Sequence, residues 1–301
     1  MNYLAAMYEI CCIGHITSDK VINAHTVVDM PGGTALYFSY AVSRLNLDYL
    51  LVTALAESEI RYVTALRDRG IEVQLQPSAH TVYFENIYSE NQDHRTQNVL
   101  QKADPFITGQ AQNINAKIFH LGPLLADDMS FGFIESLAGR GRISLDVQGY
   151  LRKVENRKVT TADWPDKQQA LQYVDIVKAD VTELRALTAC DDVHTGARIL
   201  AHWGVKEVVI TNGSQGSLIY CDGQFYTIPA YVPAEMVDAT GCGDTYMAGY
   251  LYQRVKGAGI QQAAEFAAAM SGLKTATQGP FTGTEADVNL FLSTQKWRMK
   301  G

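Results

Sequence analysis

Seven consecutive residues, DATGCGD at positions 238–244, combine the residue types that phosphoryl transfer requires. The apolar stretch that follows predicts a helix from residue 242. Gly241, Cys242 and Gly243 would then present backbone N–H groups without helical partners at the positive end of the helix dipole, where an anion is stabilised. Asp244 would lie in the first turn beside that anion, in position to accept a proton from an attacking hydroxyl. The segment therefore predicts an anion hole and a general base.

Two simpler interpretations of this segment are a helix cap and an ordinary glycine turn. A dinucleotide fingerprint is excluded, because GCGDTY lacks the third glycine, and no GxxxxGK[ST] loop occurs. The sequence also has no zinc-ligand spacing and no GxSxG elbow. The missing dinucleotide fingerprint nearly excludes a nucleotide-dependent oxidoreductase.

The elements that must position this segment follow from apolar periodicity. Buried strands are predicted at 8–13, 49–54, 117–122, 142–147, 173–179 and 206–211. Helices are predicted at 34–45, 58–70, 128–139, 181–188, 193–204, 242–257 and 260–276. This alternation predicts an α/β fold with a doubly wound, mostly parallel sheet flanked by helices, and a ligand site at the carboxyl ends of the strands.

Two segments interrupt the alternation. Residues 19–28, and 81–88 with 95–100, have the pattern of antiparallel strands, and the polar stretch 89–94 predicts the turn between the latter two. We expect insertions at about 14–29 and 74–103 to form a small β lid on a single domain, 1–301, and so to exclude water from the site. An exposed apolar face of such a lid could pair two chains into a homodimer. An edge hairpin without a functional role is the alternative.

Composition limits the kinds of partner. The 301 residues carry a net charge of −7, which argues against a nucleic-acid ligand but not against a small anion. Five cysteines without CxxC spacing favour a reducing, cytoplasmic location. The N-terminal residues do not resemble a secretory signal, and no window approaches about 18 uncharged apolar residues, so no association with a membrane is expected.

Four motifs in order resemble those of one enzyme family. DATGCGD is similar to the second signature of the PfkB (ribokinase-like) carbohydrate kinases, usually DTxGAGD. The glycine pair Gly32-Gly33 resembles the first signature, KADVTE (178–183) resembles KxNxxE, and TNGSQG (211–216) resembles TxGxxG. The agreement extends from about residue 8 to residue 285. The resemblance implies a Rossmann-like core, a small β lid, and an ATP-dependent kinase that uses Mg²⁺ and, in many members, K⁺.

The resemblance also implies roles for residues on the phosphoryl-donor side. Asp244 would activate a substrate hydroxyl toward the γ-phosphate of ATP, and the amides of Gly241, Cys242 and Gly243 would form the anion hole. The nucleotide would be lined by Thr211, Gly213 and Gly216.

Three carboxylates bear on metal ions through the same resemblance. Glu183 would position Mg²⁺ through water. Asp180 stands where the family usually has asparagine, so it would either join the metal site or cap the following helix. Asp238 matches a residue associated with a monovalent cation, usually K⁺.

The acceptor is less narrowly implied. Asp19 matches the family's sugar-hydroxyl acceptor, but Tyr37 stands where many sugar kinases have asparagine, which puts ribose-type or fructose-type recognition in doubt. The strings TVYFENIY, HLGPL and DVQGYLR resemble a branch that includes myo-inositol kinases.

Gln148 and Arg152 follow the carboxyl end of a strand and so could face the cleft together with Gly32 and Gly33. Arg152 equally begins a basic stretch typical of a solvated loop. The expected acceptor is a small sugar, polyol or nucleoside. The alternatives are a nucleoside kinase and a non-catalytic sugar or nucleotide sensor on the same scaffold.

Overall fold

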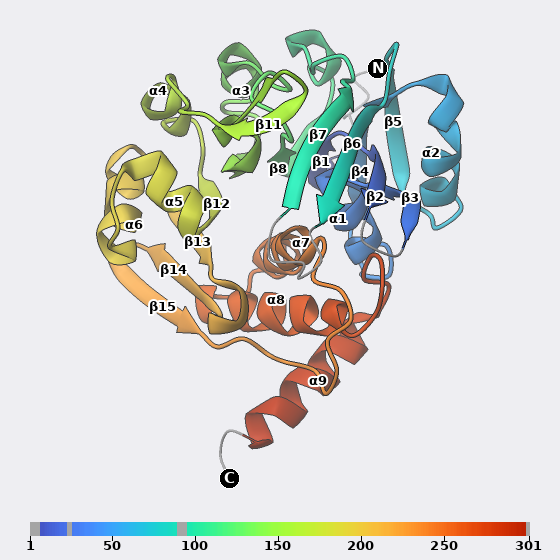
Figure 1. Ribbon diagram of the computed structural model, residues 1–301. Helices are drawn as coiled ribbons and strands as arrows, with labels where there is room; N and C mark the ends of the chain where they lie inside the picture. The colour runs from blue at the N-terminus through green and yellow to red at the C-terminus, as the bar shows by residue number, and fades with distance from the viewer. Residues whose placement is uncertain (1–6, 23–25, 89–94, 299–301) are drawn as a thin grey trace, which may run out of the picture.

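A nine-stranded sheet runs through the centre of the computed structural model, which describes residues 7–22, 26–88 and 95–298 (Figure 1). Its strand order is β15-β14-β13-β12-β9-β8-β1-β4-β5. The parallel strands are β1 (Met7–Gly14), β4 (Tyr49–Leu55), β5 (Glu72–Pro77), β8 (Asn115–Gly122), β9 (Arg142–Asp146), β12 (Ile176–Asp180) and β13 (Glu207–Thr211). Two antiparallel strands, β14 (Ser217–Cys221) and β15 (Gln224–Ile228), complete one edge. The predicted doubly wound, mostly parallel sheet is confirmed.

Helices cover both faces of this sheet. One face is covered by α1 (Thr34–Val42), α2 (Ile60–Arg67), α7 (Cys242–Val255), α8 (Ile260–Thr275) and α9 (Glu285–Arg298). The other is covered by α3 (Phe131–Ser136), α4 (Lys167–Leu171), α5 (Val181–Thr188) and α6 (Val193–His202). Each layer buries its own apolar cluster, centred on Phe38 and Tyr250 in the first and on Phe119 and Phe133 in the second. Burial of this kind supplies most of the stability of an α/β domain.

A second, six-stranded sheet lies beside α7, as Figure 1 shows. Its order is β10-β11-β7-β6-β2-β3, from β2 (Thr17–Ile22), β3 (Val27–Gly32), β6 (Val82–Tyr88), β7 (Arg95–Gln101), β10 (Arg152–Glu155) and β11 (Lys158–Thr161). We call it the small sheet. Val82, Phe84 and Val99 pack against Leu124 and Leu125, which follow β8. A small apolar core therefore joins this sheet to the carboxyl ends of the main strands.

The small sheet differs in detail from the predicted lid. Residues 19–28 are not one strand: they contain the end of β2 and the start of β3, and β2 pairs with β6 in parallel. The segment from 74 to 77 belongs to β5 of the main sheet. The expected turn at 89–94 lies outside the described residues. Within the described ranges, no helix has the length and apolar character that crossing a membrane requires.

Two hairpins were not predicted from the sequence. The turn Asp222-Gly223 joins β14 to β15, and the turn Asn156-Arg157 joins β10 to β11. All four turn residues have positive φ, as a type I′ turn requires. The Asp-Gly pair was a usable signal for the first hairpin. The second lies within the basic stretch for which a solvated loop was the alternative interpretation, and residues 152–155 and 158–161 instead pair as strands there.

Candidate active site

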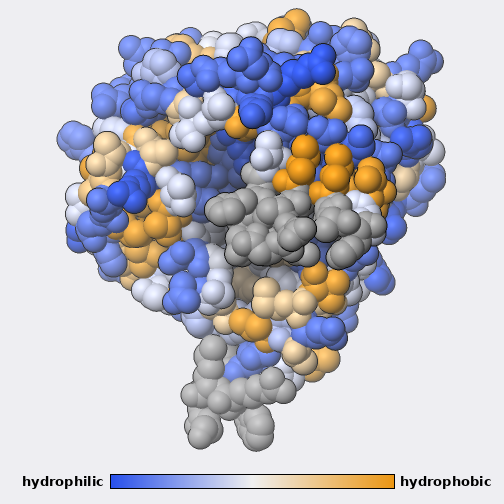
Figure 2. All heavy atoms as spheres, viewed as in Figure 1, coloured by the Kyte–Doolittle hydropathy of each residue, from blue (hydrophilic) through white to orange (hydrophobic). Residues whose placement is uncertain are grey.

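A cavity of about 910 Å³ lies between the small sheet and the carboxyl ends of the main strands. Among the residues predicted for the site, it is lined by Asp19, Gly33, Tyr37, Gln148, Arg152, Asp238, Gly241, Cys242, Gly243 and Asp244. In the view of Figure 2 the face is hollowed near its centre, and hydrophilic residues line the hollow. The fold thus brings together predicted residues that are more than 200 positions apart in the sequence.

The loop before α7 has the geometry of an anion site. Gly241 is the N-cap of α7 with φ 73°, and a Cβ at this position would lie 2.1 Å from Cδ1 of Tyr37. Only glycine meets both conditions. Within the described part of the chain, the amides of Gly241 and Gly243 have no backbone acceptor, whereas the Cys242 amide donates to the Ala239 carbonyl at 3.3 Å. The two glycine amides, rather than the predicted three, are available to an anion at the positive end of the helix.

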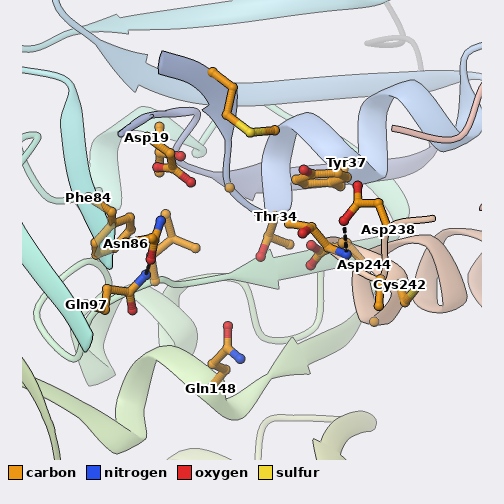
Figure 3. Close-up of a pocket in the computed structure, with 18 of the residues that line it drawn as sticks. Asp19, Thr34, Tyr37, Phe84, Asn86, Gln97, Gln148, Asp238, Cys242 and Asp244 are labelled. Carbon is orange, nitrogen blue, oxygen red and sulfur yellow. Dashed lines mark hydrogen bonds between the residues drawn. The ribbon is translucent and has the colours of Figure 1, made fainter. Parts of the chain in front are cut away.

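Asp244 lies in the first turn of α7 and its half-buried carboxyl lines the cavity. Burial raises its pKa to about 7, and the nearby Asp146 carboxylate acts in the same direction. Lys178, a hydrogen bond from Thr34 and the charge of Arg152 oppose the increase. Figure 3 shows Asp244 beside Thr34, across the cavity from the small sheet. A carboxyl with a pKa near neutrality can accept a proton and release it at physiological pH.

A buried lysine beneath the anion site was missed as a site residue. Lys178, in the middle of β12, is 5% exposed, and its Nζ lies 3.0 Å from Asp146 Oδ2 and 3.6 Å from Glu183 Oε2. A methyl group on Gly243 would lie 3.4 Å from the same Nζ. Burial lowers the pKa of Lys178, but the two carboxylates outweigh this and raise it overall. The signal was available, since Lys178 opens the KADVTE motif and Asp146 opens DVQGYLR.

The carboxylates of Glu183 and Asp180 form a capping box at the start of α5. Asp180 Oδ1 accepts from the Glu183 amide, and Glu183 Oε2 accepts from the Asp180 amide, each at 2.7 Å. Gln148 Nε2 donates to the other Glu183 oxygen at 3.1 Å. Asp180 therefore caps the helix, which is one of its two expected roles. Glu183 and Asp180 also line a second cavity of about 410 Å³ that shares Gln97, Gln148 and Arg152 with the first.

The glycine pair positions Asp19 and starts α1. A Cβ on Gly32 would lie 2.5 Å from Asp19 Oδ2, so the absence of a side chain makes room for this carboxylate. Gly32 itself is not among the residues that line the cavity, which differs from its predicted contact with substrate. Gly33 is the N-cap of α1 with φ 88°, and a Cβ there would lie 2.5 Å from the His15 carbonyl. Gly32 is thus required by the side chain of Asp19, and Gly33 by backbone geometry.

The wall that faces Asp244 carries polar side chains among apolar ones. Asn86 on β6 and Gln97 on β7 lie side by side, and Gln97 Nε2 donates to Asn86 Oδ1 at 2.9 Å. Figure 3 shows this pair and Asp19 on the side of the cavity opposite Thr34, Asp238 and Asp244. Tyr37 is 3% exposed, and among the described residues its hydroxyl has no hydrogen-bond partner. The facing wall thus offers amides and a carboxylate to a polar ligand, and Tyr37 offers a phenol hydroxyl from the Asp244 side (Figure 3).

The predicted nucleotide loop lies outside the large cavity. Thr211 ends β13 beside Asp180 of β12. Gly213 begins the exposed turn that follows, and Gly216 is buried at the end of that turn. None of the three lines either cavity among the described residues. Gly216 has φ 90°, and a Cβ there would lie 2.1 Å from the Ile228 carbonyl. Its conformation therefore has a structural reason, independent of a nucleotide.

Together these features define the class of protein. A doubly wound α/β core, a small sheet over the strand ends, and an acidic residue at a glycine-rich helix start are the architecture of ribokinase-like kinases. The sequence model of the pfkB family of carbohydrate kinases matches residues 1–287, so the chain belongs to that family. It is therefore a phosphotransferase of the carbohydrate and nucleoside kinase type.

Relatives of the chain differ in their acceptors. It is 28% identical to the cytidine kinase of Thermococcus kodakarensis over 85% of this chain and 92% of that protein. It is 25% identical to the ribokinase of Arabidopsis thaliana over 82% of this chain and 65% of that one. Among solved structures, a pyrophosphate-dependent kinase of the ribokinase family, complexed with a pyrophosphate analog and myo-inositol, is 29% identical with TM-score 0.84, covering 93% of this chain and 99% of that one. The expected resemblance to the branch with myo-inositol kinases is confirmed.

Proposed function

We propose that this kinase transfers a phosphoryl group to a hydroxyl of a small polyol, with myo-inositol as the first candidate. The observation that carries the proposal is the placement of Asp244 beside unbonded glycine amides, facing a wall of Asp19, Asn86 and Gln97. Amides and carboxylates are the groups that bind several hydroxyls of one small ring. A structure 29% identical to this chain is described as a complex with myo-inositol, which supports the same acceptor class.

In this proposal each group at the anion site has one task. Asp244 takes the proton of the acceptor hydroxyl as its oxygen attacks phosphorus. The amides of Gly241 and Gly243 stabilise charge on the transferred phosphoryl oxygens. Lys178 balances Asp146, Glu183 and Asp244, so that the acidic groups can lie close together. Since phosphoryl transfer is loose, positioning and charge stabilisation dominate over proton abstraction.

The donor is proposed to be ATP with Mg²⁺. Kinases of this family use ATP, and Mg²⁺ is typical of them. Mg²⁺ keeps several waters and needs one or two carboxylates plus the phosphates of its substrate. Glu183 and Asp180 line the second cavity, where they would hold Mg²⁺ through its waters, because both Glu183 oxygens already accept hydrogen bonds. Bound Mg²⁺ would supply positive charge to the donor phosphates. Pyrophosphate is the alternative donor, because three similar structures are described as those of pyrophosphate-dependent kinases.

We further propose that the small sheet acts as a lid over the acceptor. Bound acceptor is then expected to slow hydrogen exchange of the amides in 17–22, 82–88 and 95–101, because the sheet would be held closed. Equal exchange with and without acceptor would contradict the lid.

Val27, Val28 and Ile87 on the same sheet are 61%, 44% and 37% exposed, which supports the proposed homodimer. Light scattering tests that dimer separately.

A nucleoside is the second candidate acceptor. Two observations favour it: the cytidine kinase relative matches 85% of this chain, and the aromatic ring of Phe84 stands on the cavity wall, where a base could stack. The test is product formation with ATP or pyrophosphate as donor against a panel of inositols, pentoses, hexoses and nucleosides. Turnover on a polyol in competition with cytidine supports the first candidate. Preferred turnover of cytidine replaces it with the second.

The Asn86–Gln97 pair gives a sharper prediction about the acceptor. One similar structure is described as a myo-inositol-1 kinase converted into a myo-inositol-3 kinase by two substitutions to leucine, eleven positions apart. Asn86 and Gln97 are also eleven positions apart and touch across two strands. Leucine at both positions is expected to change which hydroxyl is phosphorylated, or to raise KM for the acceptor about tenfold or more, because the amide contacts are lost.

The product is identified by phosphorus NMR. Asn98→Leu is the matched control, because Asn98 lies on the same strand as Gln97 but bonds to Glu85 on the other face, and neither residue lines the cavity. If the double variant phosphorylates the same hydroxyl with the same KM for the acceptor, the pair does not belong to the acceptor site.

A further inference from the structure

A second buried lysine lies behind the anion site. Lys274, in the last turn of α8, is 0% exposed. Its Nζ donates to the backbone carbonyl of Asp238 at 2.7 Å and to the Oδ2 of the same residue at 2.8 Å. Burying an ammonium group costs free energy unless the group is paired, and in this chain Asp238 is the partner that offsets the cost.

Asp238 connects that ammonium to the loop that precedes α7. Its Oδ1 accepts from the Thr240 amide at 2.8 Å, and its Oδ2 accepts from the Gly279 amide at 3.1 Å. Burial raises the pKa of Asp238, but the bonds from Lys274 and Thr240 outweigh burial and lower it overall. The Asp238 carboxylate is therefore an anion held by three donors, Lys274, Thr240 and Gly279.

Two further contacts join the end of α8 to this loop. Ser271 Oγ donates to the Cys242 carbonyl at 3.0 Å. The ammonium of Lys274 lies 6.0 Å from the ring centre of Tyr37, and that ring limits the position of Gly241. The end of α8 thus contacts the segment that presents the anion-site amides both before Gly241, at Asp238, and after it, at Cys242.

The family resemblance of the sequence implied a monovalent metal ion at Asp238. This arrangement does not fit such an ion. Such an ion would need the carboxylate and carbonyl oxygens of Asp238 as ligands, and the Lys274 ammonium already uses one of each. A second positive charge a few ångströms away would be repelled in a site of low dielectric constant.

We propose that the Lys274 ammonium is a built-in cation that replaces a bound K⁺, positions residues 238–243, and makes the kinase independent of added monovalent cations. Lys274 acts through Asp238 and the loop, so it is a positioning residue. Only the activity measurement below rests on the proposed function. The thermal measurement needs no substrate, so the two can fail separately.

The first test uses the unaltered protein. Its kcat and its melting temperature are expected to be the same in equal ionic strengths of KCl, NaCl and choline chloride. A several-fold activation by K⁺ over both other salts, or a rise in melting temperature specific to K⁺, would overturn the proposal. This measurement decides even if no variant folds.

The second test removes the ammonium. Lys274→Ala opens space beside Asp238 and is expected to lower kcat about 100-fold in choline chloride, because the anion-site amides are displaced. Added K⁺ or methylammonium is expected to restore at least a tenth of the activity and to raise the melting temperature, whereas choline, which is too large, does neither. Lys274→Met fills the space without charge and is expected to resist this rescue.

Lys256→Ala is the control, since that lysine is partly exposed and pairs with Glu9. A Lys274→Ala protein with unaltered kcat overturns the proposal. A loss of activity and stability that is equal in all salts and not restored by either cation also overturns it, because the role of Lys274 would then be structural alone.

Discussion

Replacing Asp244 by asparagine is expected to lower kcat by roughly 10²–10⁴ while the donor still binds. Asparagine keeps the size and the polar contacts of the side chain, including the contact with Thr34, but it cannot accept the proton of the acceptor hydroxyl. The glycine amides and the helix dipole, which we propose stabilise the transferred phosphoryl group, are unaffected. Steady-state kinetics gives kcat, and equilibrium titration with the donor gives its Kd.

The matched control for this variant is Asp192→Asn, which caps α6 at the surface and is expected to retain full activity because asparagine caps equally well. Full turnover by Asp244→Asn would remove Asp244 as the base. A large loss of donor affinity would instead place its carboxylate in donor binding.

The raised pKa of Asp244 has consequences for both rate and stability. As a base it works in its ionised form, so the rate is expected to rise with pH through about 7 and then level off. Folding raises the pKa of this acid from 3.8 to about 7, so the folded state favours the protonated form. The contribution of this group to stability therefore falls as pH rises from about 4 to 7. Asp244→Asn should melt above wild type at pH 8, and the difference should shrink at pH 4.

Replacing Lys178 by methionine is expected to have the second large effect. The change leaves Asp146 and Glu183 buried without their cation, and breaking a buried pair in this way costs about 3–5 kcal/mol. The free energy of unfolding in urea measures this. Because the Lys178 charge also lowers the pKa of Asp244, its loss should move the rise in rate toward higher pH.

Lys206→Met provides the comparison, since its pair with Asp175 is at the surface and the lysine is 71% exposed. That change is expected to cost about 0–1 kcal/mol. Adding Asp146→Asn to Lys178→Met should recover part of the lost stability, because it removes one of the unpaired charges. An unaltered urea midpoint and pH profile in Lys178→Met would show that the ammonium does not hold these carboxylates in place.

The amino-acid sequence determined the features that depend on neighbouring residues. One short segment encodes the helix start and its acidic first turn, through Gly241, Gly243, Asp244 and the apolar run that follows. This part of the site was therefore predictable. The same holds for the capping box of Asp180 and Glu183 and for the alternation of strands and helices. Hairpin β14–β15 was also encoded locally, by Asp222-Gly223, although its signal was not used.

Only the tertiary structure decided which distant charges meet. Lys178 and Asp146 are brought together by the pairing of β9 with β12, and Lys274 reaches Asp238 because α8 packs along α7. Asn86 and Gln97 become neighbours through the register of β6 and β7. A local pattern specifies backbone conformation, because that depends on residues within a few positions. The contact between two charges depends on the order of strands and the packing of helices, which are set by burial across the whole chain.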